Sequence, residues 1–309
     1  KATKTLPNIC HLQPVKFEQR ELEQYMDLQG KALFSDDIKT LFTQFEEADN
    51  FGSLIRPVVL KDTVLRTTLE EKGVGGHLLL EHVHEDVLRV LGQAEFLQQR
   101  YQVVVANPPY MGGKGMNERI AAFLKDEYAD VKSDLFSAFM VRNTTLTMPK
   151  GEMGFVTPYV WMFISSYEKL REFILTNTTI TSLIQLEYNA FAPACIPVST
   201  FTLKNVSDSD FKGGYVRLSD FKGSENQSPR TLEAISNPDC GWFHRACTSD
   251  FKKIPSSPIA YWLSEKFISI FEDGTPLVDM ASRITKGIFT GDNNRFLRFW
   301  FEVSNSDSG

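Results

Sequence analysis

The segment 101–110 has the sequence YQVVVANPPY and indicates the class of fold. Its first six residues include three consecutive valines, and the asparagine and two prolines that follow would stop a strand. A short apolar run bounded by such breakers predicts a buried parallel strand in an α/β sheet. Open α/β sheets bind their ligands beyond the carboxyl ends of the strands. We therefore expect the turn Asn107–Tyr110 to lie at the functional site.

The residue types in this turn suit chemistry on an amino group. Asn107 and Pro108 each precede a proline, which disfavours helical backbone angles and predicts a stiff, extended turn. The Asn107 side-chain oxygen and the Pro108 carbonyl oxygen could accept both protons of one planar amine. This would draw the nitrogen lone pair out of conjugation, towards an incoming methyl group. Tyr110 could stack on the ring that bears the amine. A base in duplex DNA must be flipped out of the helix to reach such a site.

The flanking segments predict how the chain is organised. Upstream, residues 8–15 predict a short apolar strand, and residues from about 18 to 100 predict a helical block that resembles an insertion. Downstream we expect strands at 151–158, 180–187 and 196–203, and helices at 133–148 and 167–176. Strands that alternate with helices indicate a parallel α/β sheet. No helix separates the last two strands, which favours an antiparallel finish.

Composition narrows the class of protein. The chain has 309 residues, of which 42% are hydrophobic, enough for a globular core. Its net charge of −6 argues against a compact nucleic-acid-binding module, but not against an enzyme whose basic surface lies elsewhere in a longer chain. The missing initial methionine and the polar tail at 304–309 lead us to expect a truncated piece. No membrane span or signal peptide is evident, so we expect a cytoplasmic protein.

No metal site is predicted. The four cysteines are scattered and fit neither a zinc ligand set nor a disulfide framework. His77, His82 and His84 lie among carboxylates, and both side-chain types can bind metals. They form no ligand set of recognised spacing, so the solvated start of a helix is the simpler interpretation.

The turn and its surroundings resemble a known family. Asn107–Tyr110 after an apolar strand is similar to motif IV of amino-group methyltransferases, especially the adenine-N6 class. Residues 101–113, 132–136 and 151–158 resemble successive motifs of large adenine-specific enzymes, and residues 284–294 do so more loosely. Together they resemble the PglX methyltransferases of BREX phage-defence systems and related type II restriction-modification methyltransferases.

This resemblance implies a fold and a division of the chain. The fold would be a partial class I, Rossmann-like α/β fold of S-adenosylmethionine-dependent methyltransferases, with a helical insertion and part of a second region. Residues 1–204 would form the partial catalytic domain. Residues 205–309 would form a linker and the start of a target-recognition region.

The resemblance also implies a function. The protein would be a site-specific DNA adenine-N6 methyltransferase of a phage-defence or restriction-modification system. Its partners would be double-stranded DNA and other subunits of a defence complex, with no membrane. Two alternatives stay open. One is methylation of an RNA base or of a protein glutamine, and the other is a non-catalytic module that binds a partner.

Individual residues acquire roles by the same resemblance. Asn107, Pro108 and Tyr110 would be catalytic and hold the target amine. Pro109, Phe191 and Asp134 would bind the substrate, with Phe191 packing against the flipped base and Asp134 near the floor of the site. The simpler alternatives are an ordinary strand-ending turn, a core phenylalanine and a helix-capping aspartate.

The implied cofactor is S-adenosyl-L-methionine, but its binding residues in this chain are unknown. The family places its glycine-rich loop and the acidic ribose-binding residue upstream of Asn8. Neither Gly73–Gly76 nor Gly112–Gly115 matches a strand–loop–helix fingerprint. We therefore expect this chain alone to bind the cofactor poorly and to be inactive.

Overall fold

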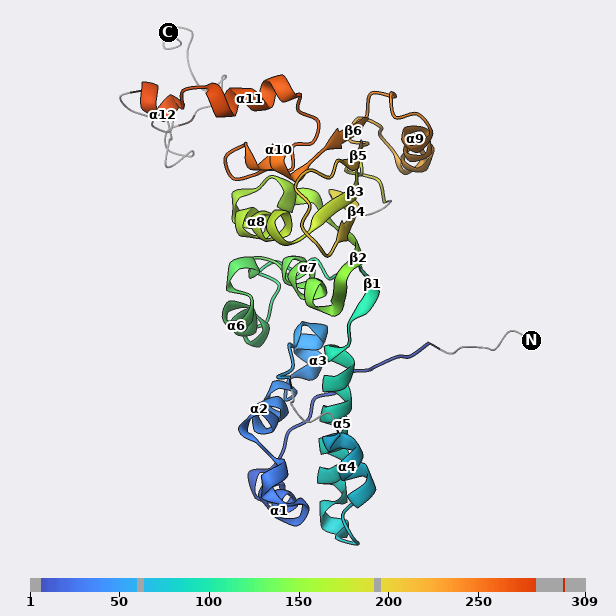
Figure 1. Ribbon diagram of the computed structural model, residues 1–309, viewed down its shortest axis with the longest axis vertical. Coiled ribbons are helices and arrows are strands. Elements are labelled where there is room, and N and C mark those ends of the chain that lie inside the picture. Colours follow the sequence, from blue (N-terminus) through green and yellow to red (C-terminus); the bar gives the residue numbers. More distant parts are fainter. Residues whose placement is uncertain (1–6, 60–63, 192–195, 282–296, 298–309) are drawn as a thin grey trace, which may run out of the picture.

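A computed structural model describes residues 7–59, 64–191, 196–281 and 297. Figure 1 shows an elongated molecule with a helical region at one end and a mixed sheet above it. The segment at 284–294 that resembles the family lies outside the described residues. None of the described helices is long and apolar enough to cross a membrane.

The helical region confirms the predicted helical block. Its elements are α1 (Gln19–Gln29), η1 (Lys31–Leu33), α2 (Asp36–Gln44), α3 (Ala48–Phe51), η2 (Gly52–Leu54), α4 (Leu65–Lys72), η3 (Leu78–Leu80) and α5 (Glu81–Gln98). Helix α5 buries Val87, Val90, Leu91 and Ala94, whose spacing places them on one face of a helix. They pack with Tyr25, Leu41 and Phe45 into a core separate from that of the sheet.

The prediction of a strand at residues 8–15 is wrong. Residues 7–18 form neither helix nor strand, and the segment runs along the helical region. The Val15 backbone N–H donates to the Phe45 carbonyl oxygen at 3.0 Å, and the Val15 side chain is buried in the helical core. Helices rather than a neighbouring strand therefore bury this apolar segment.

The described residues contain one sheet of six strands. These are β1 (Tyr101–Ala106), β2 (Thr147–Pro158), β3 (Thr179–Gln185), β4 (Val198–Lys204), β5 (Gly213–Arg217) and β6 (Phe243–Ala246), in the order β1-β2-β4-β3-β5-β6. Strands β1 and β2 are parallel, whereas β4 runs antiparallel between β2 and β3. This confirms the α/β class and the antiparallel finish. Strands β5 and β6 continue the same sheet beyond residue 204.

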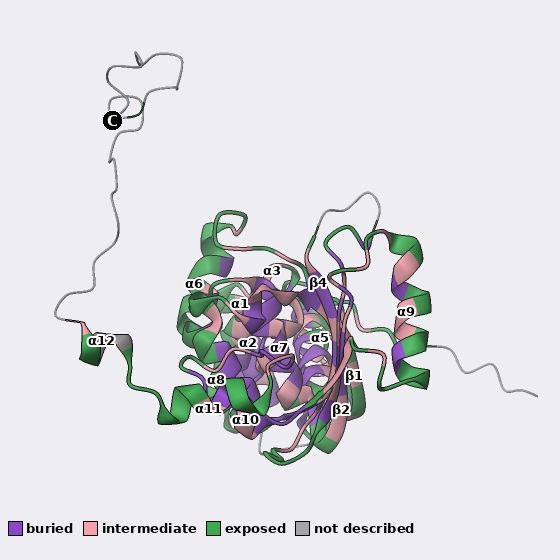
Figure 2. Cartoon of the chain, turned by 90° about the horizontal axis from the view of Figure 1, so that it is seen from above, coloured by how far each residue is buried: buried purple, intermediate pink, exposed green. Residues whose placement is uncertain are grey.

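Helices cover the two faces of the sheet unequally (Figure 2). On one face lie α6 (Glu118–Glu127), α7 (Leu135–Leu146), α8 (Glu168–Asn177) and α10 (Thr248–Lys252). The short helices η4 (Ala129–Val131), η5 (Tyr159–Met162) and η6 (Ser165–Tyr167) contact α8. The main core, which includes Phe136, Phe155, Trp161 and Phe201, lies between these elements and the sheet. Helix α9 (Ser224–Ser236) lies on the opposite face, and α11 (Glu265–Asp273) and α12 (Leu277–Met280) follow.

Strand β1 is parallel, as predicted, but only one of its faces is buried. Val104 and Ala106 pack against the main core, whereas Val103 and Val105 are 60% and 78% exposed. Among the described residues β1 pairs with β2 alone and lies at the edge of the sheet. The expectation that the strand is buried was therefore wrong for the face that carries Val103 and Val105.

One buried arginine joins the helical region to the sheet. Arg142 on α7 is almost fully buried, and its guanidinium donates to the carbonyl oxygens of Ser53 at 2.9 Å and Leu97 at 2.8 Å. Burial lowers the pKa of Arg142, which still remains a cation at neutral pH. The side chain thus holds two carbonyl groups from separate parts of the helical region against α7.

Candidate active site

The predicted turn follows β1 directly at the carboxyl edge of the sheet. Asn107 and Pro109 are exposed, Pro108 is buried and Tyr110 is half-buried. The Tyr110 hydroxyl lies 3.1 Å from Asn107 Oδ1 and 3.1 Å from the Val156 carbonyl oxygen on β2. No hydrogen bond of the described residues reaches the Pro108 carbonyl oxygen. The turn therefore presents an exposed amide side chain beside an available main-chain acceptor.

Tyr110 of the turn packs in an aromatic cluster with Phe136 and Tyr167. The Tyr110 ring meets Phe136 edge-on, with centroids 6.5 Å apart and planes at 88°. Phe136 in turn contacts Tyr167 at 5.4 Å. Burial, and secondarily the negative charge of Asp134, raises the pKa of Tyr167 to about 12. Burial also raises the pKa of Tyr110, so both hydroxyls stay protonated at neutral pH.

Asp134 caps α7 and also fixes the residue that follows the turn. Its Oδ1 accepts from the backbone N–H of Phe136 at 3.3 Å and of Met111 at 3.0 Å. The Leu135 N–H donates back to the Met111 carbonyl oxygen at 3.1 Å. Burial raises the pKa of Asp134 despite these backbone donors, which by themselves would lower it. Asp134 thus connects the turn to the first turn of α7.

Phe191 lies at the same edge of the sheet as the Asn107–Tyr110 turn, but it does not adjoin the turn. It is 52% exposed and follows β3, so it is not a core phenylalanine among the described residues. In the strand order, β3 is three positions from β1, which corresponds to about 14 Å. No described contact joins Phe191 to residues 107–110. The adjoining residues 192–195 lie outside the described part of the chain.

The buried carboxylate of Glu187 holds the segment that leads to Phe191. Its Oε2 accepts from the Asn189 N–H at 2.9 Å and from the Gly223 N–H at 3.4 Å. The Glu187 N–H donates to Gln227 Oε1 on α9 at 3.1 Å. The segment that carries Phe191 is therefore connected to residues beyond position 204.

Sequence reasoning missed Arg217, which ends β5 at this edge. The strand register places Arg217 beside Gln185, Ser199 and Thr157 in one row across the sheet. Its guanidinium lies 4.8 Å from the Trp262 ring centroid and donates to Ser219 Oγ at 3.1 Å. Among the described residues it takes part in no ion pair. Nothing in the local sequence distinguishes this arginine, because the pairing of β5 with β3 places it there.

The histidine cluster has ordinary partners. His82 Nε2 lies 3.0 Å from Glu21 Oε2, and His84 Nδ1 lies 2.8 Å from the Tyr25 hydroxyl. No group of three or more His, Cys, Asp or Glu side chains within the described ranges is placed to hold a metal ion.

Neither of the two glycine-rich segments has the structure of a cofactor-binding loop. Gly73–Gly76 lies between α4 and η3, so a helix and not a strand leads directly into it. Gly112–Gly115 follows the Asn-Pro-Pro-Tyr turn, where the Gly115 N–H closes a tight turn onto the Gly112 carbonyl oxygen at 2.8 Å. Neither segment leads from a strand directly into a helix, as a nucleotide-binding loop does. We therefore assign no cofactor-binding residue to the described part of the chain.

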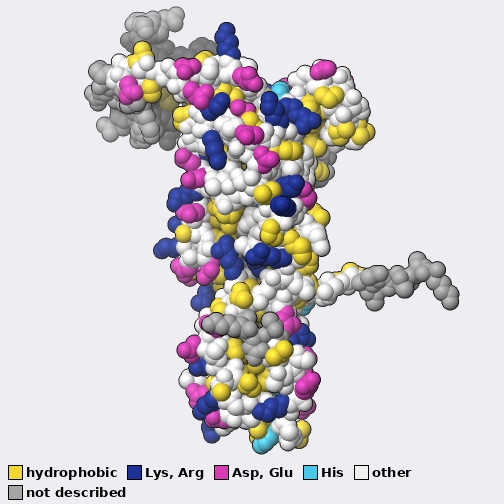
Figure 3. All heavy atoms as spheres, viewed as in Figure 1, with side chains coloured by type: hydrophobic (Ala, Val, Ile, Leu, Met, Phe, Trp, Pro, Cys, Tyr) yellow, Lys and Arg dark blue, Asp and Glu magenta, His cyan; other side chains and the backbone are white. Residues whose placement is uncertain are grey.

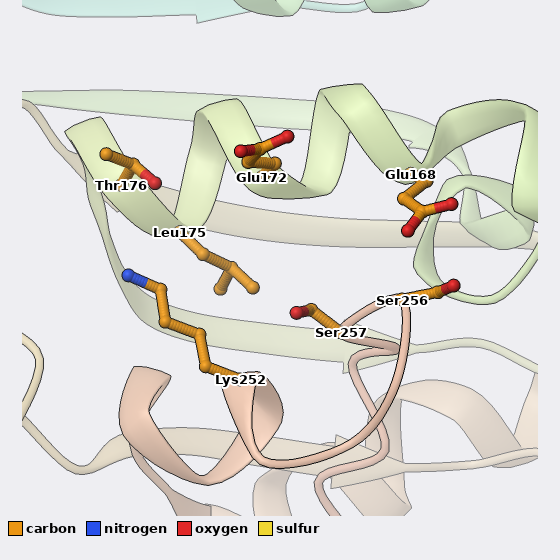
Figure 4. Close-up of a pocket in the computed structure, with 7 residues that line it drawn as sticks. All are labelled: Glu168, Glu172, Leu175, Thr176, Lys252, Ser256 and Ser257. Carbon is orange, nitrogen blue, oxygen red and sulfur yellow. The ribbon is translucent and has the colours of Figure 1, made fainter.

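A cavity of about 440 Å³ lies away from the turn, between α8 and α10 (Figure 4). Glu168, Glu172 and Thr176 line it from α8, and Lys252 extends towards α8 from the other side. Its lower wall includes Ser256, whose carbonyl oxygen accepts from two nitrogens of the buried Arg171 at 3.0 and 2.9 Å. None of the predicted site residues lines this cavity.

Charges of both signs are interspersed along the face of the molecule in Figure 3. The described residues on that face form no extended basic surface, and the net charge of the chain is −6.

Comparison with known proteins identifies the family. The profile of the Eco57I restriction-modification methylase family matches residues 17–191, which include the turn, Asp134 and Phe191. The chain therefore belongs to this family, and its likeness to the PglX methyltransferases is confirmed.

Curated relatives agree with this assignment. The chain is 36% identical over 293 residues to the adenine-specific methyltransferase BrxX of Escherichia coli O9:H4 (strain HS), across 90% of this chain and 24% of BrxX. It is 29% identical to the adenine-specific methyltransferase PglX of Lacticaseibacillus casei (strain Zhang), across 96% of this chain and 25% of PglX. A third relative is the restriction enzyme and methyltransferase RM.Eco57I of Escherichia coli, 24% identical over 45% of this chain and 15% of its own length. The chain thus spans about a quarter of the length of the first two relatives.

Proposed function

We propose that this chain carries the amine-binding part of a site-specific DNA adenine-N6 methyltransferase of a phage-defence or restriction-modification system. One observation carries the proposal. The Asn107 side chain is exposed at the carboxyl end of β1, next to a Pro108 carbonyl oxygen that has no hydrogen-bond partner among the described residues. The names of the BrxX and PglX relatives support adenine as the target base.

In this proposal the chain binds and orients the amine. The Asn107 side-chain oxygen and the Pro108 carbonyl oxygen each accept one proton from N6 of a flipped adenine. Pro109 keeps the turn rigid, and the Tyr110 ring packs against the base. Asp134 fixes the loop beyond the turn through the Met111 N–H. Phe191 would form the other wall of the base site. Catalysis would rest mainly on positioning and preorganised acceptors.

The methyl donor we propose for the whole protein is S-adenosyl-L-methionine. The described residues include no strand–loop–helix cradle for it, so we expect the 309-residue chain alone to bind it poorly and to be inactive. Isothermal titration calorimetry of this chain with S-adenosylmethionine tests that expectation, and tight binding would contradict it.

We propose that double-stranded DNA binds at the edge of the sheet that carries the Asn107–Tyr110 turn and Arg217. Four strand spacings separate β5 from β1, so Arg217 lies about 19 Å along the edge from the turn. Arg217 has no carboxylate partner among the described residues, and at that distance from a flipped base it is suitably placed for a backbone phosphate on the same duplex. We propose that residues 1–204 form the catalytic part, with the helical insertion at about 18–100. Residues 205–309 would begin the target-recognition region. We propose other subunits of a defence complex as further partners, because the likeness to the PglX methyltransferases of BREX systems implies them.

The substrate class can be tested directly. Full-length protein is incubated with isotopically labelled S-adenosylmethionine and either duplex DNA, RNA or a glutamine-containing protein substrate. The proposal predicts label in DNA alone, on adenine N6. Label only in RNA or protein would favour the corresponding alternative. Absence of transfer to any of the three, with a properly folded protein, would favour a non-catalytic binding module.

A further inference from the structure

The Asn-Pro-Pro-Tyr turn ends the β1–β2 ladder in an unusual way. The last paired residues are Ala106 on β1 and Phe155 on β2. Pro108 and Pro109 have no N–H and cannot continue the ladder as donors. Beyond the last pair, the Val156 carbonyl oxygen of β2 accepts from the Tyr110 hydroxyl at 3.1 Å. A side chain thus takes the place of a main-chain donor at the end of the ladder.

The same hydroxyl also lies 3.1 Å from Asn107 Oδ1. A tyrosine hydroxyl has a single proton, so it cannot donate two full hydrogen bonds at once. Two acceptors at equal distance therefore share this proton. Burial raises the pKa of Tyr110, so the shared proton is retained at neutral pH.

We propose that the Tyr110 hydroxyl is a positioning group that holds the Asn107 carboxamide ready for the substrate amine. In the free protein the shared proton connects Asn107 Oδ1 with the Val156 carbonyl oxygen of β2. When an amine donates to the Asn107 oxygen, the hydroxyl proton turns fully towards the Val156 carbonyl oxygen. Both lone pairs of the Asn107 oxygen are then available to the amine, and the Tyr110 ring does not have to move. Only hydrogen bonds change in this step, and no covalent bond forms or breaks.

This inference rests on the proposed function and adds a second role to Tyr110. The ring would pack against the base, whereas the hydroxyl would act only through Asn107. The two roles can be separated, because Tyr110→Phe removes the hydroxyl and retains the ring.

The test uses the full-length protein with Tyr110→Phe and, as a matched control, Tyr101→Phe. Tyr101 begins the same strand and donates one hydroxyl hydrogen bond, to Gln99 at 3.0 Å, at the end far from the site. For Tyr110→Phe we expect kcat for adenine methylation to fall about three- to tenfold, with KM within about twofold of the wild-type value. A fluorescent adenine analogue at the target position should still report base flipping. Tyr101→Phe should retain wild-type kinetics.

The positioning role of Tyr110 and the proposed function would be contradicted by different results. Wild-type kcat in Tyr110→Phe, or a higher KM with unchanged kcat, contradicts the positioning role. Full methylation by Asn107→Ala instead contradicts the proposed function itself. If Tyr110→Phe does not fold, a fluorinated tyrosine at position 110 provides a second variant, because its hydroxyl deprotonates at lower pH. We expect deprotonation of the Tyr110 hydroxyl to lower kcat at alkaline pH, and this loss should occur at lower pH in the fluorinated variant. An unchanged pH profile would refute the proposal.

Discussion

The Asp134 carboxylate accepts a hydrogen bond from the backbone N–H of Met111 at 3.0 Å, across 23 positions of the sequence. Met111 directly follows the Asn-Pro-Pro-Tyr turn, and Asp134 is the N-cap of α7. A single carboxylate therefore fixes both the end of the turn and the start of the helix behind it. Because α7 packs in the main core, the core of the protein determines where the turn lies.

Asp134→Ala should destabilise the protein by about 1 kcal/mol, because it removes an N-cap acceptor. Asp134→Asn should have a much smaller effect, since the amide oxygen can accept from the same N–H groups. Urea denaturation followed by circular dichroism measures both values. Equal destabilisation by Ala and Asn would mean that the charge, rather than the acceptor, holds the turn.

The pH dependence of the free energy of unfolding should reflect the raised pKa of Asp134. Burial raises its pKa in the folded state, so between its unfolded and folded pKa values the folded protein binds more protons. Stability from this group is therefore present at low pH and is lost as pH rises through the folded pKa. Asp134→Asn should gain stability relative to wild type as pH is raised from about 4 upwards. A difference that is constant with pH, or that changes in the opposite direction, would contradict this assignment.

Arg142→Ala should destabilise the protein by roughly 2–4 kcal/mol, because the Ser53 and Leu97 carbonyl oxygens lose a buried donor. Arg119→Ala is the matched control. Arg119 is exposed and pairs with Glu47 at 2.8 Å, and such surface pairs contribute less than about 1 kcal/mol. Chemical denaturation of both variants decides the matter, and similar losses would show that Arg142 does not join the helical region to α7.

Arg217→Gln in the full-length protein should weaken DNA binding and lower the slope of log K against log salt by about 1, if this side chain contacts one phosphate. Arg66→Gln is the control, because Arg66 lies in the helical region and pairs with Glu70 and Glu95. Fluorescence anisotropy at several salt concentrations gives the slopes. An unchanged slope for Arg217→Gln would remove Arg217 from the DNA interface.

The sequence was most informative where local pattern and chemistry agreed. The apolar run before Asn107 predicted β1. The sequence between residues 187 and 196 has no helical pattern, and this predicted the antiparallel pairing of β3 with β4. Residues 8–15 misled because helices can bury a short apolar segment as well as a sheet can. Three consecutive valines suggested burial on both faces, but alternate side chains point to opposite faces, and only the face towards α7 is covered.

Other features of the site depend on contacts between distant residues. The Tyr110 hydroxyl meets a carbonyl oxygen 46 positions away, and the row that contains Arg217 joins four strands. Neither relationship follows from local spacing. The role of Asp134 as a helix cap could be foreseen from its place before an apolar helix, whereas its bond to Met111 could not.

Quantification of N6-methyladenine in genomic DNA tests whether the protein methylates adenine and whether this depends on Asn107. Genomic DNA from cells that express the full-length protein, either wild type or with Asn107→Ala, is digested and measured by mass spectrometry. We predict that the modified base is present with the wild-type protein and disappears with Asn107→Ala, while both proteins accumulate and fold equally. Undiminished N6-methyladenine with Asn107→Ala would contradict the proposed role of Asn107, and none with the active wild-type system would contradict adenine methylation.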